Sequence, residues 1–184
     1  MTFLKKLYLL LFVWDYPSAA HEVEMRTADA VVTQSHSPIS FGNAGPGNKI
    51  MASVARQIST KCGLPLLIQE EMELADPTIQ YVHISKDPNR SGFSTLSWNT
   101  FEIVKLQKEF CDKKGWRRVV VVAHPDHMMR ACAVYQKLGL EAMAAPMPKR
   151  LRSYSCPGSF QFGLVGFRVR ETLCRFLFWY WEYI

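Results

Sequence analysis

The fold is decided by residues 117–130, RRVVVVAHPDHMMR, which predict a buried strand, a tight loop and the start of a helix. Four consecutive valines are typical of a strand that is covered on both faces, as in a parallel sheet. Pro125 should end the strand, Asp126 should cap the helix that follows, and Gly139 should end that helix. Such a strand and helix form one unit of an α/β sheet.

Four polar side chains, His124, Asp126, His127 and Arg130, crowd the carboxyl end of this strand, where open α/β sheets bind their ligands. His127 and Arg130 are three residues apart and share one face of the first helical turn. With the helix N-terminus they favour binding of a phosphate or carboxylate. Two alternatives stay open: His124, Asp126 and His127 could ligate a metal, or Asp126 could simply cap while Arg130 pairs with a nearby carboxylate.

Apolar runs of strand length alternate along the chain with runs of helical spacing. Besides the valine run, strands are expected at 28–33, 66–68, 81–84 and 140–144. This alternation predicts an α/β fold, a Rossmann-like three-layer α/β/α arrangement with a mostly parallel sheet of about five strands. The composition, 48% hydrophobic and 21% charged, is that of a globular chain, so residues 1–184 are expected to form a single domain.

A glycine loop containing Gly42 and Gly45 joins the first strand to the next helix, where nucleotide-binding folds hold phosphates. Its spacing matches neither the dinucleotide fingerprint nor a P-loop. Asn48 should cap the helix after it. Ser35 and His36 follow the first strand and are expected at the same edge. Neighbouring side chains of a strand diverge, however, so the two do not form a catalytic dyad.

A further polar group, Asn99, Thr100 and Glu102, begins the helix that should run to about Lys114. Asn99 and Glu102 have the spacing of a capping box, which accounts for both residues. The predicted topology also places the group at the same sheet edge as His127, where it could contact a ligand.

The first residues permit two interpretations. Residues 3–14 have the apolar spacing of an amphipathic helix that packs on the body, and we favour this helix. The region also imitates a signal peptide, although its apolar run is short and interrupted. Five scattered cysteines without a Cys-x-x-Cys pair favour a reducing compartment. We therefore expect a cytoplasmic protein, with an exported or envelope-associated protein as the alternative.

The last residues, 149–184, carry an excess of basic side chains and end in a run of aromatic ones. A helix is expected over 167–184, packing on the body through an apolar stripe that includes Val169 and Leu173. The alternative is contact with a membrane surface or a protein partner through the basic aromatic residues. A solvated basic helix face also explains the charge, so we expect no specific nucleic-acid partner.

Several short motifs, taken in order, resemble those of the YdcF-like (DUF218) family of bacterial proteins. They are Trp14-Asp15-Tyr16, the strand at 28–32, Ser35-His36, and residues 97–102, 127–131 and 138–141. The resemblance implies a Rossmann-like fold in which these motifs meet at one pocket. It also implies a ligand of phosphate or nucleotide character, with S-adenosylmethionine as a candidate cofactor, and no settled reaction.

The chain departs from the family pattern in two places. Gln34 stands where the family usually has a glycine before Ser-His. Residues 68–72 form an acidic stretch in place of the Ser-Gly-Gly turn and helix start that the family often has. One crossover of the sheet is therefore expected to be abbreviated.

The leading interpretation is a protein that binds a small anionic, nucleotide-like ligand at the carboxyl edge of the sheet. Arg130 and His127 would hold negative charge. If a reaction follows, His127 or His36 is the candidate acid or base, because imidazole titrates near neutrality. Such an enzyme would be a transferase or hydrolase of a phosphorylated or nucleotide substrate. The alternatives are a non-enzymatic envelope-associated or regulatory binding module and a metal-dependent phosphohydrolase. The candidate ligand-binding residues are Ser35, Gly42, Gly45, Asn99, Thr100, Glu102, His124, Asp126 and Arg130.

Overall fold

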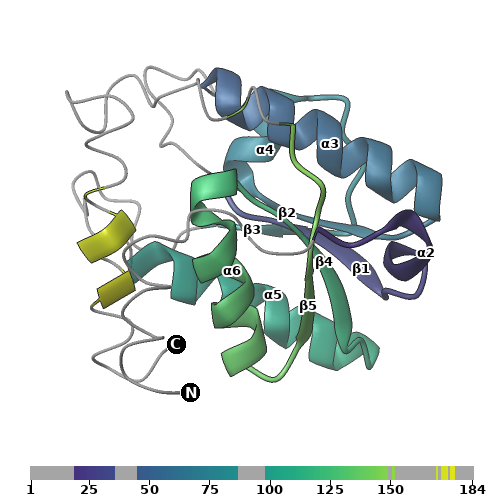
Figure 1. Cartoon of the computed structure of the whole chain (residues 1–184). Helices are drawn as coiled ribbons and strands as arrows, with labels where there is room; N and C mark the ends of the chain where they lie inside the picture. The colour runs from purple at the N-terminus through teal and green to yellow at the C-terminus, as the bar shows by residue number, and fades with distance from the viewer. Residues whose placement is uncertain are drawn as a thin grey trace.

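A parallel sheet of five strands, in the order β3-β2-β1-β4-β5, forms the centre of the molecule (Figure 1). The computed structural model describes residues 19–35, 45–86, 98–148, 151, 169, 171–173 and 175–176, without the side chains of 98 and 99. The strands are β1 Ala30–Thr33, β2 Leu66–Gln69, β3 His83–Ser85, β4 Arg118–Val122 and β5 Glu141–Ala144. All four pairings between neighbouring strands are parallel, which confirms the predicted α/β fold class.

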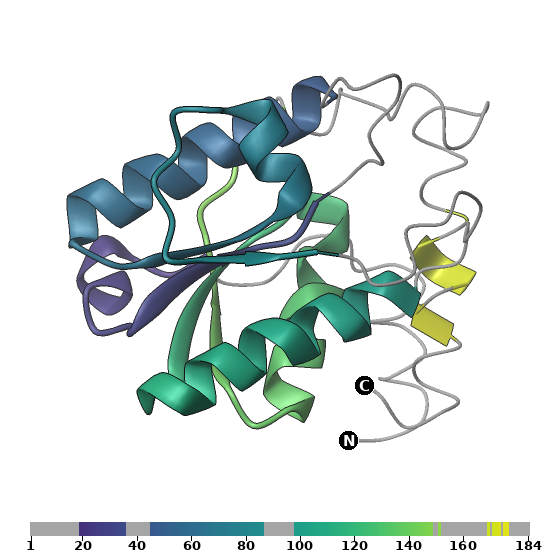
Figure 2. The ribbon, with the colours of Figure 1, turned by 180° about the vertical axis from the view of Figure 1, so that it is seen from behind.

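Helices cover both faces of the sheet, as Figures 1 and 2 show from opposite sides. They are α2 Glu22–Met25, α3 Pro46–Cys62, α4 Glu70–Ala75, α5 Trp98–Lys114 and α6 Pro125–Lys137. Helices α3 and α4 pack on one face, and α5 and α6 on the other. The helices before β3 and those after it lie on opposite faces, and the chain runs outward from β1 in opposite directions across the sheet in these two halves. The connections between parallel strands therefore all have the same handedness. The result is a Rossmann-like three-layer α/β/α fold.

The valine run forms β4, the strand between β1 and β5. Successive side chains of a strand point to opposite faces. Accordingly, Val119 and Val121 join the core under α5 and α6, while Val120 and Val122 join the core under α3 and α4. All four are fully buried, which explains why the sequence here is continuously apolar and does not alternate.

Two helices begin earlier than the sequence predicted. The N-cap of α6 is His124, so the expectation of Asp126 is wrong, and the N-cap of α3 is Gly45, so the expectation of Asn48 is wrong. In both helices a proline occupies the first position. Proline suits that position because its fixed φ is helical and its missing N–H would have no partner there. The cap therefore falls on the residue before the proline.

Other helix boundaries follow the sequence more closely. Gly63, Gly115 and Gly139 adopt positive φ values of 69°, 72° and 84° at the ends of α3, α5 and α6, as expected of glycine after a helix. Asn99 lies inside α5, so its predicted role as the N-cap in a capping box with Glu102 is wrong. Helix α4 has only six residues, which confirms the abbreviated crossover.

The predicted terminal helices fall largely outside the described residues. The whole of 3–14 lies outside them, and of 167–184 only 169, 171–173 and 175–176 are described, all of them helical. Ala19 forms a parallel bridge to Ala144 of β5, the last strand in the order of the sheet. Within the described part of the chain, no helix combines the length and apolarity needed to cross a membrane.

Candidate functional site

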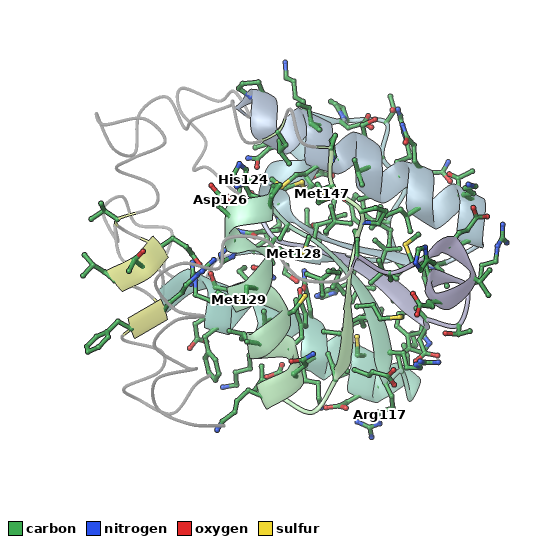
Figure 3. All side chains as sticks on the ribbon, viewed as in Figure 1. Arg117, His124, Asp126, Met128, Met129 and Met147 are labelled. Atoms are coloured by element: carbon green, nitrogen blue, oxygen red, sulfur yellow. The ribbon has the colours of Figure 1, made fainter. Side chains whose placement is uncertain are left out.

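The direction of the chain across the sheet reverses between β1 and β4, and open α/β sheets bind ligands beside the carboxyl ends of such strands. Gln34 and Ser35 follow β1 there, and His124 follows β4. Figure 3 labels His124 and Asp126 at the start of α6, on the side of the helical residues 169–176, and Arg117 at the opposite end of the sheet. The candidate site is this edge.

His124 joins β4 to α6 and is 1% exposed. Its Nδ1 accepts a hydrogen bond from the backbone N–H of Asp126 at 3.3 Å, and its Nε2 lies 3.2 Å from the backbone oxygen of Leu151. A carbonyl only accepts, so the ring is neutral and carries its proton on Nε2. Both ring nitrogens are therefore used by the protein, and His124 holds the loop and helix in place.

Arg130 makes a two-pronged ion pair with Glu171, a residue 41 positions further along the chain. Its Nε and Nη2 donate to the two carboxylate oxygens of Glu171, each at 2.9 Å. Its Nη1 donates to Oγ1 of Thr100 at 3.2 Å. Arg130 is 5% exposed and Glu171 2% exposed. The alternative expectation, that Arg130 pairs with a nearby carboxylate, thus describes the observed arrangement, and Thr100 lies at the same edge.

His127 lies beside this pair, with Nδ1 3.4 Å from Oε2 of Glu171. Among the described residues Nδ1 has no hydrogen-bond partner, so the approach to Glu171 is a contact and not a bond. Burial, and then the positive charge of Arg130, lower the pKa of His127 from 6.5 to about 4. At neutral pH His127 is therefore a neutral imidazole, and it does not supply the positive charge that the sequence suggested.

Arg175 completes the group. It is fully buried, its Nη2 donates to the backbone oxygen of Asp126 at 2.7 Å, and its Nε lies 3.4 Å from Oε1 of Glu171. Burial lowers the pKa of Arg175, while the carboxylates of Glu171 and Asp126 act in the opposite direction. We call His127, Arg130, Glu171 and Arg175 the ion cluster.

The Glu171 carboxylate is the shared partner of the ion cluster. Burial alone would raise the pKa of Glu171, but Arg130 and His127 outweigh burial and bring it well below its usual range. Glu171 is therefore ionised in the folded protein at neutral pH. One buried carboxylate thus faces two buried guanidinium groups across the first turns of α6.

Among the described helical residues of this segment, 169, 171–173 and 175–176, the buried ones are the charged Glu171 and Arg175 and not the apolar side chains. Val169 and Leu173 are 55% and 59% exposed, so the predicted apolar stripe is wrong for these residues. The cause is the ion cluster, because a buried guanidinium needs a carboxylate partner and thereby fixes which face of the helix turns inward. The signal in the sequence was Glu171 and Arg175, an acidic and a basic residue one turn apart within an apolar helix.

A second buried polar group lies deeper along α6. Nε2 of Gln34 donates to the hydroxyl of Tyr135 at 2.9 Å and lies 3.5 Å from Oε1 of Gln107. The Tyr135 hydroxyl bonds to Oε1 of Gln107, and Nε2 of Gln107 donates to the backbone oxygen of Thr33 at 3.2 Å. We call Gln34, Gln107 and Tyr135 the glutamine–tyrosine cluster. Sequence reasoning noted Gln34 only as a departure from a family pattern.

The remaining candidates are more scattered. The backbone N–H of Ser35 donates to Oε1 of Gln69 at 2.8 Å, which ties the end of β1 to the end of β2. Gly45 caps α3 without a side-chain hydrogen bond, and Glu102 is half-buried on α5. Outside the described residues or side chains lie His36, Gly42 and the side chain of Asn99.

Two further features bear on the alternatives. Within the described residues, no group of three His, Cys, Asp or Glu side chains could hold a metal ion, so the set His124, Asp126 and His127 does not form one. A groove of about 860 Å³ runs along α2 and α3 beside residues 146–148, and none of the candidate residues lines it. The sheet edge at the start of α6 is therefore the candidate functional site.

Comparison of the chain with protein-family models, with curated proteins and with solved structures found no match. The resemblance to the YdcF-like family therefore stays a prediction carried by the motifs themselves.

Proposed function

We propose that this chain binds a small anionic, nucleotide-like ligand at the carboxyl edge of its sheet, where α6 begins. The observation that carries the proposal is the pairing of Arg130 with both oxygens of a carboxylate that comes from a distant part of the chain. A buried guanidinium edge that donates to two oxygens side by side can equally hold a carboxylate or a phosphate of a ligand.

The position of Arg130 supports this proposal. It lies in the second turn of α6, the helix that follows β4, beside the point where the sheet reverses its strand order. The positive end of the α6 macrodipole adds to the attraction for an anion at this edge. Near-complete burial strengthens the charge interaction, since few water molecules can screen it.

The other residues of the edge have supporting roles in the proposal. His127 is neutral at neutral pH and would offer a hydrogen bond to a ligand, not a charge. Thr100 holds one arm of the Arg130 guanidinium through its hydroxyl and so fixes the plane of the fork. His124 keeps the start of α6 in place by accepting a hydrogen bond from the backbone N–H of Asp126. The proposal is for binding and includes no reaction step.

The ligand class follows from the oxygens that Arg130 can hold. Nucleotides carry phosphate oxygens, and S-adenosylmethionine carries a carboxylate with the same paired oxygens as Glu171. Membership in the YdcF-like family, which the motifs suggest, would make a ligand of this kind its natural occupant. Nucleotides and S-adenosylmethionine both carry an anionic group on a larger molecule, which the edge between β1 and β4 could accommodate.

Isothermal titration calorimetry with ADP, S-adenosylmethionine and inorganic phosphate tests the proposal. A single change at Arg130 would leave Glu171 buried without its partner, so the informative variant is the double substitution Arg130→Met with Glu171→Met. This variant removes the guanidinium and its carboxylate together and keeps their volume. We expect it to lose binding of whichever probe the wild type binds, by at least about tenfold, the loss of one charge-assisted contact.

The matched control is Arg117→Ala, which removes an exposed guanidinium at the opposite end of the sheet. It should leave the affinity unchanged, because a long-range effect of net charge is small at physiological salt. If the folded double variant keeps the wild-type affinity, the ligand does not bind at Arg130 and the proposed site is wrong.

A further inference from the structure

The Nε and Nη2 edge of Arg130, which the proposed function assigns to a ligand, is already occupied by Glu171. We propose that Glu171 is an internal competitor for this anion site, so that ligand binding and docking of the helical residues 169–176 exclude one another. This inference rests on the proposed function and adds a regulatory contact to it. The ligand would be one that presents two oxygens in a plane, as a carboxylate or phosphate does.

The competitor is well matched to the site. Its two oxygens each lie 2.9 Å from a nitrogen of Arg130, which is the geometry of a fork-to-fork pair. Oε2 also lies 3.4 Å from Nδ1 of His127. Glu171 thus pairs with the guanidinium and lies against the neighbouring imidazole, so an anion that bound both groups would have to displace it.

Two of the described residues in the segment 169–176, Glu171 and Arg175, reach the body through polar contacts. Besides the Arg130 pair, Arg175 donates to the backbone oxygen of Asp126 at 2.7 Å. Val169, Leu173 and Phe176 are instead 55%, 59% and 44% exposed. Figures 1 and 2 both place the yellow helical segment beside the starts of α5 and α6. Of these contacts, a ligand anion could replace the one that Glu171 makes with Arg130.

The energetics of buried ion pairs make such an exchange feasible. Burying Glu171 and Arg175 removes their hydration, and their mutual attraction offsets this cost only in part. On release both side chains regain water, while Arg130 keeps an anionic partner in the ligand. The exchange therefore does not leave Arg130 as an unpaired buried charge.

The first test compares affinities for ADP and for inorganic phosphate by calorimetry, in the wild type and in Glu171→Gln. Glutamine keeps the shape of the side chain and removes its charge, so it should compete less well for Arg130. We expect the affinity to rise by about 5- to 150-fold, the usual range of coupling between two sites. The matched control is Glu141→Gln, an exposed acid at the other edge of the sheet, which should change nothing.

The second test measures hydrogen exchange in the wild-type chain with and without saturating ADP or phosphate. Peptides covering residues 169–176 should exchange faster with the probe bound, while peptides of α3 should not change. Arg175→Gln, which removes the contact with Asp126 and keeps the Arg130–Glu171 pair, should raise the affinity by a smaller factor than Glu171→Gln. If Glu171→Gln does not fold, these two measurements carry the test.

The outcomes separate this inference from the proposed function. Binding that is equal or weaker in folded Glu171→Gln, or slower exchange of residues 169–176 with the probe bound, would show that Glu171 does not compete, while the anion site would stand. Binding only in Glu171→Gln would support both. Absence of binding in the wild type and in folded Glu171→Gln would overturn the proposed function, and the competitor with it.

Discussion

Helix α6 carries two buried polar clusters that are built in opposite ways. Near its start, His127 and Arg130 belong to the ion cluster, and about two turns further on Tyr135 belongs to the glutamine–tyrosine cluster. Both are almost completely buried. One contains full charges, whereas the other contains only neutral amides and a phenol.

The clusters also differ in where their partners come from. The glutamine–tyrosine cluster is completed by β1, α5 and α6, the elements that form the core. The ion cluster is completed by Glu171 and Arg175, from a segment 41 or more positions beyond its partners on α6. The difference teaches that the glutamine–tyrosine cluster is completed by elements of the central fold, while the ion cluster at the sheet edge depends on a segment distant in sequence.

The largest expected effect comes from breaking the ion cluster on one side. Arg130→Ala would leave the Glu171 carboxylate buried beside a neutral imidazole, with Arg175 as its remaining cation at 3.4 Å. We expect the free energy of unfolding to fall by about 3–5 kcal/mol, the usual cost of removing one partner from a buried ion pair. Urea unfolding followed by circular dichroism measures this directly.

The double substitution Arg130→Met with Glu171→Met is the control, because it removes both charges together. Its unfolding free energy should fall by less than that of Arg130→Ala, since the Glu171 carboxylate is no longer left buried without Arg130, although Arg175 loses its 3.4 Å contact with Glu171. If Arg130→Ala costs no more than the double substitution, the carboxylate of Glu171 is hydrated and not buried, and the contrast between the two clusters fails.

Mild acid should weaken the ion cluster before it affects the glutamine–tyrosine cluster. The pKa of His127 is about 4 in the folded chain and 6.5 as its ordinary value, so between these values the unfolded chain binds more protons than the folded chain. Stability is therefore lost as the pH falls from about 6.5 to 4, by up to about 3 kcal/mol. Urea unfolding at several pH values measures this slope.

His127→Gln should flatten that slope, because glutamine does not titrate. Burial and the nearby Lys113 also lower the pKa of His83, which adds a contribution of the same sign, so the variant and not the slope alone isolates His127. Protonation of Glu171, whose pKa lies well below its usual range, contributes only at lower pH. An unchanged slope in His127→Gln would mean that the ion cluster does not respond to acid in this range.

Local sequence patterns predicted the central strand and the candidate edge because both depend on near neighbours. The valine run requires burial on both faces wherever it lies, and it forms the middle of a parallel sheet. The alternation of strands and helices then places Thr100 and Arg130 at one edge, where they meet. Their separation of 30 positions did not prevent the prediction, because topology and not distance in sequence decides it.

The sequence did not predict Glu171 and Arg175, because their role depends on a contact that no periodicity encodes. Helical spacing favoured an inward apolar stripe with Val169 and Leu173, yet pairing with Arg130 turned the opposite face inward. The caps of α3 and α6 were misplaced for a more local reason, a proline that starts each helix. In this segment the ion pair of Glu171 with the buried Arg130, and not the apolar spacing, determines which helix face turns inward.

The smallest expected effect is at Tyr135, and it sharpens the comparison. Tyr135→Phe removes the hydroxyl that bonds to Gln34 and Gln107, and leaves the ring in the core. Gln34 keeps its 3.5 Å contact with Gln107, and Gln107 also keeps its bond to the backbone oxygen of Thr33. We therefore expect a loss of about 1–3 kcal/mol in the free energy of unfolding. The affinity for ADP or phosphate should stay the same, because none of these groups touches Arg130. A change in affinity without a change in stability would mean that the glutamine–tyrosine cluster belongs to the binding site, and that the two clusters on α6 act as one.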